Sequence, residues 1–128
     1  MRTILTTFFV AMALLLSFTT ARAEVPASAS KEVSHLLSYL SSSGCQFYRN
    51  GTWHDAEAAR AHLEKKYNYL LEKDLVKTAE DFIRLGATES SLSHEPYKVR
   101  CGEQEQSSQD WLNAELLRYR QTESSPAP

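Results

Sequence analysis

The residues whose types could support acid–base or metal chemistry lie in one short segment, His54, Asp55, Glu57 and His62. Imidazole and carboxylate groups bind zinc or transfer protons when several of them converge on one point. This spacing does not favour convergence, because Asp55 is placed to cap the following helix and a five-residue offset turns Glu57 and His62 about 140° apart. We therefore predict no metal site and no cofactor.

Ser90, Ser91 and Ser93 supply hydroxyl groups in a second segment. No Gly-x-Ser-x-Gly elbow surrounds them, and no catalytic base is identifiable beside them. Hydrogen bonds in turns and caps are the ordinary role of serines in such a segment. We expect residues 87–95 to form a surface loop, and we predict that the chain is not an enzyme.

Cys45 and Cys101 are the two cysteines of the chain. They lack the Cys-x-x-Cys spacing of a redox site, and four scattered His residues do not complete a zinc quartet. In an exported protein such a pair usually forms a disulfide. Closing a loop of about 57 residues would restrict the unfolded chain by about 4 kcal/mol, which is comparable to the whole stability of a small domain.

The N-terminal segment has the pattern of a cleavable export signal. Arg2 precedes an apolar run over residues 4–18, and Ala21 and Ala23 suit signal peptidase. A membrane anchor is the alternative, but a run of about 15 residues is shorter than the ~20 that span a bilayer. We predict a signal peptide over residues 1–23 and no membrane anchor after its cleavage.

Size and charge indicate one modest domain. Removing residues 1–23 from the 128-residue chain leaves 105 residues, enough for a single core. Two of the 14 Lys and Arg residues leave with the signal, so 12 basic residues face 16 acidic ones and the net charge is −4 with His neutral. This balance argues against nucleic-acid binding, which depends on excess Lys and Arg. We predict one compact domain over residues 24–120 and a disordered polar tail over residues 121–128.

Hydrophobic periodicity near 3.6 residues indicates four helices. Ser30, Asp55 and Thr78 are the expected N-caps, because their side-chain oxygens can accept from the first free backbone N–H groups. Gly44 and Gly86 are the expected stops. The expected helices span residues 30–43, 56–72, 79–85 and 108–120.

Segments rich in β-branched and aromatic residues indicate three short strands, over residues 45–49, 52–54 and 96–101. Asn50-Gly51 lies between the first two and is the strongest two-residue hairpin signal. This turn also explains the sequon Asn50-Gly51-Thr52 without glycosylation. Pro96 opens the third strand and suits an edge position. We predict an α+β fold of three or four helices packed on a three-stranded antiparallel sheet, in the order α-β-β-α-α-β-α.

The disulfide and the strand pattern together predict the register of the sheet. Cys45 opens one strand and Cys101 closes another, as antiparallel neighbours require. If the two cysteines face each other, Phe47 lies opposite Val99 on the same face of the sheet. That face is then apolar, and we expect the helices to pack on it.

The same register places Arg49 opposite Tyr97 at the rim of the apolar face. Two alternatives follow for Arg49. It pairs with a carboxylate of the second helix such as Glu57, which is the favoured interpretation, or it receives an anionic ligand.

The opposite face of the sheet interleaves aromatic and cationic side chains. It carries Gln46, Tyr48, Lys98 and Arg100, and pairing across the hairpin adds Trp53. The favoured interpretation is that basic side chains lie over the rings, in cation–π contacts of about 0.5–1 kcal/mol each. The alternative is a docking surface, because Trp, Tyr and Arg are enriched at binding hot spots.

Three runs stand out in order along the chain: Ser43-Gly44-Cys45-Gln46-Phe47-Tyr48-Arg49-Asn50-Gly51, Thr78-Ala79-Glu80-Asp81-Phe82-Ile83 and Pro96-Tyr97-Lys98-Val99-Arg100-Cys101. Together they resemble a family of small exported proteobacterial proteins of unknown function, the YfeK-like group, over residues 33–120. The resemblance implies a Gram-negative periplasmic location and brings no activity, cofactor or catalytic residue with it. The chain departs from the family at His94, where we expect the family to favour Gly.

We predict a non-catalytic binding module that acts through the hairpin and the adjoining Ser-rich loop. The partner would be another periplasmic protein or a cell-envelope component. Two alternatives remain: an enzyme inhibitor or immunity protein, which a rigid and exposed loop over residues 90–95 would favour, and a small hydrolase, which would need a pocket with a nucleophile and base in contact. The residues predicted to form the binding surface are Tyr48, Arg49, Trp53, Ser91, Tyr97 and Arg100.

Overall fold

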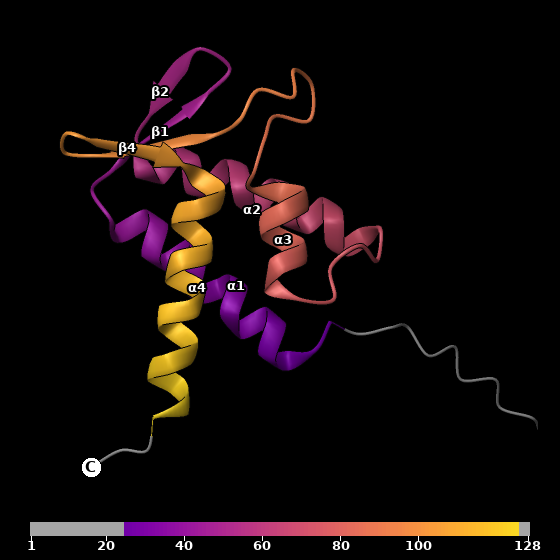
Figure 1. Cartoon of the computed structure of the whole chain (residues 1–128). Helices are drawn as coiled ribbons and strands as arrows, with labels where there is room; N and C mark the ends of the chain where they lie inside the picture. Colours follow the sequence, from indigo (N-terminus) through magenta and orange to yellow (C-terminus); the bar gives the residue numbers. More distant parts are fainter. Residues whose placement is uncertain (1–24, 126–128) are drawn as a thin grey trace, which may run out of the picture.

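A computed structural model describes residues 25–125 of the chain. The predicted signal peptide and the last three residues of the predicted tail lie outside this range. The elements are α1 (Ala27–Ser42), β1 (Gln46–Arg49), β2 (Thr52–His54), α2 (Ala56–Glu72), α3 (Ala79–Gly86), β3 (Lys98–Cys101), β4 (Gln104–Ser107) and α4 (Ser108–Ser124). The sheet lies at one end of the molecule, and α1, α3 and α4 extend away from it (Figure 1). The predicted α+β class is confirmed. Within residues 25–125, every helix is too short or too polar to cross a membrane.

The sheet has four strands rather than the predicted three. Their order is β2-β1-β3-β4, and each neighbouring pair is antiparallel. β4 follows β3 through a two-residue turn whose first residue, Gly102, has a φ of 64°, a conformation that glycine adopts readily in tight hairpins. The sequence did not reveal β4 because Gln-Glu-Gln-Ser has no apolar alternation. The strand depends on pairing with β3 rather than on the propensity of its own residues.

The prediction that Pro96 marks an edge strand is wrong. β3 begins at Lys98 and lies between β1 and β4. Pro96 precedes the strand and forms an isolated bridge with Glu89, so its missing N–H removes no hydrogen bond from the β3 ladder. The polar strand β4 takes the edge, where charged and polar residues discourage pairing with another chain.

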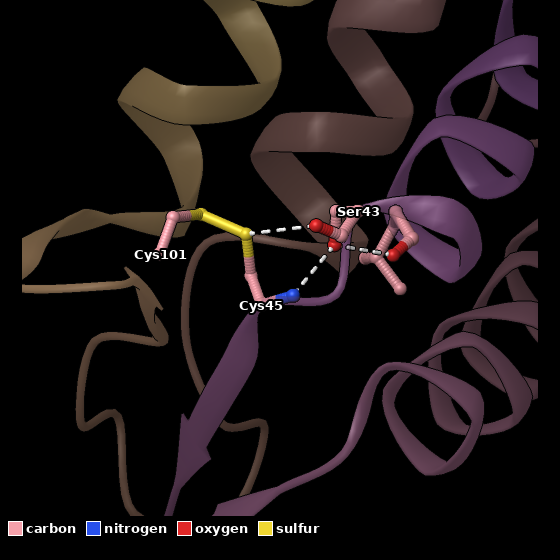
Figure 2. The surroundings of a disulfide bond; sticks show 4 residues. Ser43, Cys45 and Cys101 are labelled. Atoms are coloured by element: carbon pink, nitrogen blue, oxygen red, sulfur yellow. Dashed lines mark hydrogen bonds between the residues drawn. A yellow bond between two sulfur atoms is a disulfide. The ribbon is translucent and has the colours of Figure 1, made fainter.

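The predicted disulfide is present and joins the start of β1 to the end of β3. The sulfur atoms of Cys45 and Cys101 are bonded, and their Cα atoms are 4.5 Å apart. This Cα separation is typical of directly opposed, non-hydrogen-bonded residues in an antiparallel pair. Figure 2 shows Ser43 beside the bridge, where its hydroxyl accepts a hydrogen bond of 3.2 Å from the backbone nitrogen of Cys45. The bridge and this bond hold the connection between α1 and the sheet.

The register predicted from the disulfide is confirmed. Phe47 pairs with Val99 across β1 and β3, and Tyr48 pairs with Trp53 across the hairpin. The two residues between β1 and β2 have φ angles of 49° and 86°, as a type I′ turn requires. Phe47 and Val99 are buried, and the Phe47 ring lies 5.5 Å from the Trp111 ring of α4. The helices therefore pack on the disulfide face, as expected.

One core joins the helices to this face of the sheet. Its most deeply buried members include Leu36, Leu40, Phe82, Val99 and Leu112. They come from α1, α3, β3 and α4, so elements distant in the sequence share the same apolar interior. This core orients α2 and the hairpin relative to each other.

Two of the three predicted N-caps are confirmed. The Asp55 carboxylate accepts a hydrogen bond of 2.8 Å from the backbone nitrogen of Ala58, at the start of α2. Thr78 and Asp81 form a capping box at the start of α3. Each of these side chains satisfies a backbone N–H that has no partner inside the helix.

Other helix boundaries differ from the prediction. α1 begins at Ala27 rather than behind the predicted cap Ser30, because Ala29 is buried against the core and its contacts extend the helix. Gly86 is the last residue of α3 rather than its stop, and a Cβ atom there would lie 3.3 Å from the Leu70 side chain. Glycine thus permits α3 to pack closely on α2. α4 continues to Ser124, so the predicted disordered tail does not begin at Gln121.

Removing the disulfide should lower stability strongly without changing the sheet register. We expect Cys45→Ala/Cys101→Ala to lose about 4 kcal/mol in the free energy of unfolding, since the unfolded chain regains the entropy of an open loop. Urea denaturation of the variant and of the intact protein, with and without reductant, measures the difference. A loss below 1 kcal/mol, or iodoacetamide labelling of the unreduced denatured protein, would contradict the assignment.

Candidate functional site

The six residues predicted as one binding surface occupy three separate places. Tyr48, Trp53 and Arg100 lie on the face of the sheet opposite the core, and Ser91 lies on the loop before β3. Arg49 and Tyr97 lie at a pocket between the hairpin and α2, which Tyr48 also borders. The alternation of side chains along a strand separates neighbours such as Tyr48 and Arg49. The structure thus offers a sheet face, a pocket and a loop.

The sheet face is a ladder of cation–π contacts. The Lys98 Nζ lies 5.1 Å from the centre of the Tyr48 ring, and the Arg100 Cζ lies 4.0 Å from the centre of the Trp53 ring. The two rings meet edge to face at 5.5 Å. Arg100 also donates a hydrogen bond of 2.8 Å to the side-chain oxygen of Gln46. This confirms the packing interpretation of the face, in which each cation is stabilised by a ring.

A pocket of about 30 Å³ lies between the hairpin and the first turns of α2. Its polar lining comes from these residues: Tyr48, Arg49, His54, His62, Tyr97, Lys98 and Ser108. Apolar walls are contributed by β1 and by α2. A volume of this size holds one or two water-sized groups, so the pocket can receive the end of a ligand rather than a whole one.

Arg49 contacts His62 rather than the predicted Glu57. The Arg49 Nη1 lies 3.0 Å from the His62 Nδ1, and the His62 Nε2 lies 3.1 Å from the Tyr97 hydroxyl. Glu57 lies in the first turn of α2 and is exposed. His62 is just over one helical turn further along and lies nearer the strand. The side chains of Arg49 and Tyr97 therefore meet through His62. The ladder of β1 and β3 itself ends one pair earlier, at Tyr48 and Lys98.

The contact with Arg49 determines which ring nitrogen of His62 carries hydrogen. A guanidinium group can only donate, so the His62 Nδ1 must accept and the Nε2 must carry the proton in the neutral ring. The Nε2–H then donates to the Tyr97 hydroxyl. Burial is the largest cause that lowers the pKa of His62 from 6.5 to about 4, and the positive charges of Arg49, Lys66, His54 and Lys65 contribute to the same shift in that order. His62 is therefore neutral at pH 7.

Lys66 lies beside the pocket, and the sequence did not predict its contacts there. Its Nζ donates to the Tyr97 hydroxyl at 3.1 Å and to the Glu89 carbonyl oxygen at 3.0 Å. Burial lowers the pKa of Lys66; the carboxylate of Glu89 opposes this effect and the charge of Arg49 adds to it. Burial also raises the pKa of the Tyr97 hydroxyl, which the charge of Arg49 partly offsets. In the sequence, the one feature that could have linked Lys66 to His62 was its position one turn further along the same helix.

The loop before β3 is held by its own hydrogen bonds. The buried Ser90 hydroxyl accepts from the backbone nitrogens of Leu92 and Ser93, each at 3.3 Å. The Ser90 backbone nitrogen donates to the Glu95 carbonyl oxygen at 3.0 Å. These contacts confirm the predicted turn role of the serines. His94 has a φ of 61°, a left-handed conformation that glycine adopts at lower cost, which accounts for the glycine expected there.

The loop is also fastened to the hairpin. The Ser93 hydroxyl donates to the side-chain oxygen of Asn50 at 2.5 Å, and it accepts from the Glu95 backbone nitrogen at 3.2 Å. Between these contacts Leu92 is 91 % exposed. In Figure 1 this orange segment projects from the molecule between α3 and β3, on the same side as the hairpin. A fixed loop thus presents one large apolar side chain to solvent.

The segment with possible metal ligands has structural contacts instead. Asp55 caps α2, and His62 contacts Arg49 and Tyr97. Across residues 25–125, no group of three or more His, Cys, Asp or Glu side chains is placed to hold a metal ion.

A second buried polar group links α1 and α4. Glu115 is 4 % exposed and its carboxylate is 3.0 Å from the His35 Nε2. Arg118 donates two hydrogen bonds through its Nε to this carboxylate, at 2.8 Å and 3.0 Å. These hydrogen bonds, led by those from Arg118, lower the pKa of Glu115 against the opposing effect of burial. The only sequence signal was the position of Glu115 in the apolar seam of the last helix.

Comparison with known proteins assigns a family. A model described as a family of unknown function (DUF5329) matches residues 27–120. The chain belongs to this family. The match begins with the first residue of α1 and ends within α4, so it includes the sheet, the pocket and the loop of this DUF5329 protein. No curated protein and no solved structure matches the chain.

The stability of this DUF5329 protein should fall as the pH decreases from about 6.5 to about 4. The pKa of His62 is about 4 in the folded state and 6.5 as a reference, so the unfolded chain binds more protons in this interval and protonation favours unfolding. Urea denaturation at pH 7 and pH 5 measures the difference. His62→Gln should flatten this dependence.

The matched control is His94→Gln, which removes an exposed imidazole from the loop. It should leave the slope of stability against pH close to that of the wild type. A direct NMR titration of the His62 ring gives the second measurement. A midpoint near 6.5 in the folded protein would show that burial and Arg49 do not act on this ring as described.

The cation–π contact between Arg100 and Trp53 should be measurable as a coupling free energy. A double-mutant cycle with Arg100→Met and Trp53→Leu should give about 0.5–1 kcal/mol. Lys73 and Tyr69 supply a matched pair, since this cation lies further from its ring, at 5.8 Å. Equal coupling free energies in the two pairs would contradict the prediction that the shorter contact stabilises the fold more.

Proposed function

We propose that this DUF5329 protein is an exported, non-catalytic binding module that contacts another periplasmic protein or a cell-envelope component. The contact surface would be the hairpin–loop rim, which consists of residues 90–95 and the turn residues Asn50 and Gly51. The observation that carries the proposal is the full exposure of Leu92 on a loop that hydrogen bonds hold in place. A surface of this kind binds by burying its apolar side chain in a pocket of the partner.

The rigidity of the loop supports binding because it reduces the entropy lost on association. A flexible loop must be ordered when the complex forms, and this ordering opposes binding. Here Ser90 and Ser93 organise the loop before any partner arrives, and Asn50 connects it to the hairpin. Each of these hydroxyls takes part in structural hydrogen bonds, which supports binding rather than nucleophilic catalysis.

Export to the periplasm is part of the same proposal. The disulfide supports it, because such bonds persist in oxidising compartments and are rare in the cytosol. The apolar N-terminal run, followed by Ala21 and Ala23, supports cleavage by signal peptidase. The motifs that resemble the YfeK-like group support a Gram-negative source. We propose that the mature protein begins at Glu24.

The loop also favours a second function, inhibition of an enzyme or immunity to one. An inhibitor of this type inserts a fixed, projecting loop into a cleft, and the hydrogen-bonded loop with Leu92 at its tip has that form. The two functions differ in the nature of the partner. If the partner is an enzyme and its activity falls when this protein is added, the protein is an inhibitor or immunity protein.

Photo-crosslinking in the cells that make the protein tests the surface. A photoreactive residue at position 92 should give a discrete cross-linked product, while the same residue at Leu117 should not. Leu117 is the matched control because it is also an exposed leucine, at 61 %, but lies on α4. Mass spectrometry of the product identifies the partner.

Binding of the purified partner then measures the contribution of the loop. Leu92→Asp should weaken affinity by about tenfold or more, because a charge replaces a central apolar contact. Leu117→Asp should leave it unchanged, and Ser93→Ala should weaken it less than Leu92→Asp by loosening the loop. The proposal fails if positions 92 and 117 give the same products, or if both aspartate variants bind as the wild type does.

A further inference from the structure

The pocket between the hairpin and α2 is unusual in the charges around it. The cations Arg49 and Lys98 line it beside the rings of His54 and of the neutral His62, and its lining contains no Asp or Glu. Lys66 adds a further cation at the Tyr97 hydroxyl. The mature chain as a whole carries more acidic than basic residues, so this concentration of positive charge does not follow from composition.

Neither Arg49 nor Lys66 forms an ion pair within residues 25–125, although the carboxylate of Glu89 is near enough to raise the pKa of Lys66. The ion pairs there include other cations of the same helix and sheet, such as Arg60 with Glu64 at 2.7 Å and Lys98 with Glu105 at 3.9 Å. Arg49 donates instead to a neutral imidazole. A partly buried cation that lacks an anion loses hydration without a compensating ion pair.

Several donors near Tyr97 are also left without acceptors in the described part of the chain. The Tyr97 oxygen accepts from the His62 Nε2–H and from Lys66, which occupies both of its lone pairs and leaves its own hydrogen to donate. Arg49 uses one of its five N–H groups, and Lys66 uses two of its three. The pocket is thus rich in donors and poor in acceptors.

The lowered pKa values of His62 and Lys66 agree with this electrostatic environment. Burial is the first cause for each, and the charge of Arg49 lowers both pKa values, while the carboxylate of Glu89 opposes the shift of Lys66. A bound anion would reverse the contribution of the neighbouring cations, because an opposite charge within a few ångströms favours the protonated form. Binding of an anion should therefore raise both pKa values.

We infer that the pocket binds the carboxylate group of an organic acid or of a chain-terminal residue, which Arg49 and the Tyr97 hydroxyl hold. Lys66 lies outside the lining and adds positive charge through its contact with that hydroxyl. His62 is a positioning residue, since its contacts orient Arg49 and Tyr97 without requiring a charge of its own. The first turn of α2 is not the anion site, because the Asp55 carboxylate already accepts from it. The site thus consists of side chains rather than of a helix terminus.

The size and walls of the pocket favour a carboxylate over a phosphate. A cavity of about 30 Å³ accommodates a planar group with two oxygen atoms, and a guanidinium group matches the two oxygens of a carboxylate in a paired geometry. Phe47, Ala59 and Leu63 form apolar walls, which would contact the carbon chain attached to the carboxylate. A phosphate carries a larger tetrahedral group and supplies nothing to pack against these walls.

This inference is independent of the proposed binding through the loop. Leu92 and the hairpin–loop rim could bind a protein whether or not the pocket takes a ligand, and the reverse also holds. Photo-crosslinking at position 92 therefore reports on one proposal, and titration of the pocket with small acids reports on the other.

Titration with sodium butyrate at constant ionic strength tests the pocket. In NMR spectra, butyrate should shift the amide signals of Ala58 and Ala59 and the ring signals of His62 in a saturable manner, and the midpoint of the His62 titration should move upward. Butyramide, which has the same shape without the charge, should not saturate the site. A short peptide with a free C-terminal carboxylate and its amidated form distinguish a chain-terminal ligand from a small acid.

Variants identify the residues that hold the carboxylate. Arg49→Gln should weaken butyrate binding by about tenfold or more, since the variant loses a charged donor, and Tyr97→Phe should weaken it less while keeping the ring in the core. Arg60→Gln is the matched control, because it removes the same charge from an arginine of α2 that is already paired with Glu64. Circular dichroism and urea denaturation verify that each variant folds.

Three outcomes would overturn the inference. The first is equal affinity for butyrate in the wild type and in Arg49→Gln. The second is an equal response to butyrate, butyramide and chloride, which would indicate a general solvent effect. The third is tighter binding of inorganic phosphate than of butyrate at the same residues, which would assign the pocket to a different anion.

Discussion

The disulfide between Cys45 and Cys101 is the constraint on which the described structure depends. It holds the first residue before β1 against the last residue of β3, and the period of two along a strand then assigns every neighbouring side chain to a face. Phe47 and Val99 turn to the helices, while Tyr48 and its basic neighbours turn away. A shift of one residue would bury the cations and expose the core, so the bridge separates the two surfaces as well as restricting the unfolded chain.

The same register brings Arg49 and Tyr97 to the edge of the core, where α2 supplies His62 and Lys66. A guanidinium group in contact with an imidazole has a defined effect: it fixes the Nε2–H form of His62 and disfavours its protonation. The resulting pocket is positive, donor-rich and partly apolar. These properties follow from how the sheet and one helix approach each other, and they give the pocket a chemistry distinct from the exposed Leu92 of the loop.

Local signals in the sequence predicted much of this arrangement. The hairpin turn, the capping box at Thr78 and the cap at Asp55 depend on residues within a few positions of one another, so their side chains and backbone geometry suffice to identify them. The apolar seam of α4 was visible because its residues repeat with the helical period. The cation–π ladder was predictable because the disulfide specified which residues of two strands lie side by side.

The sequence by itself thus determined the class of the fold, its register and the composition of the two sheet faces, because each follows from short-range patterns and one covalent link. Only the tertiary structure decided that Arg49 meets His62 instead of Glu57, that Lys66 reaches Tyr97, and that four polar residues form a fourth strand. Those contacts depend on the rotation and position of α2 against the sheet and on the ladder offered by β3. These positions result from packing between residues that are distant in the sequence, so no local sequence pattern predicts them.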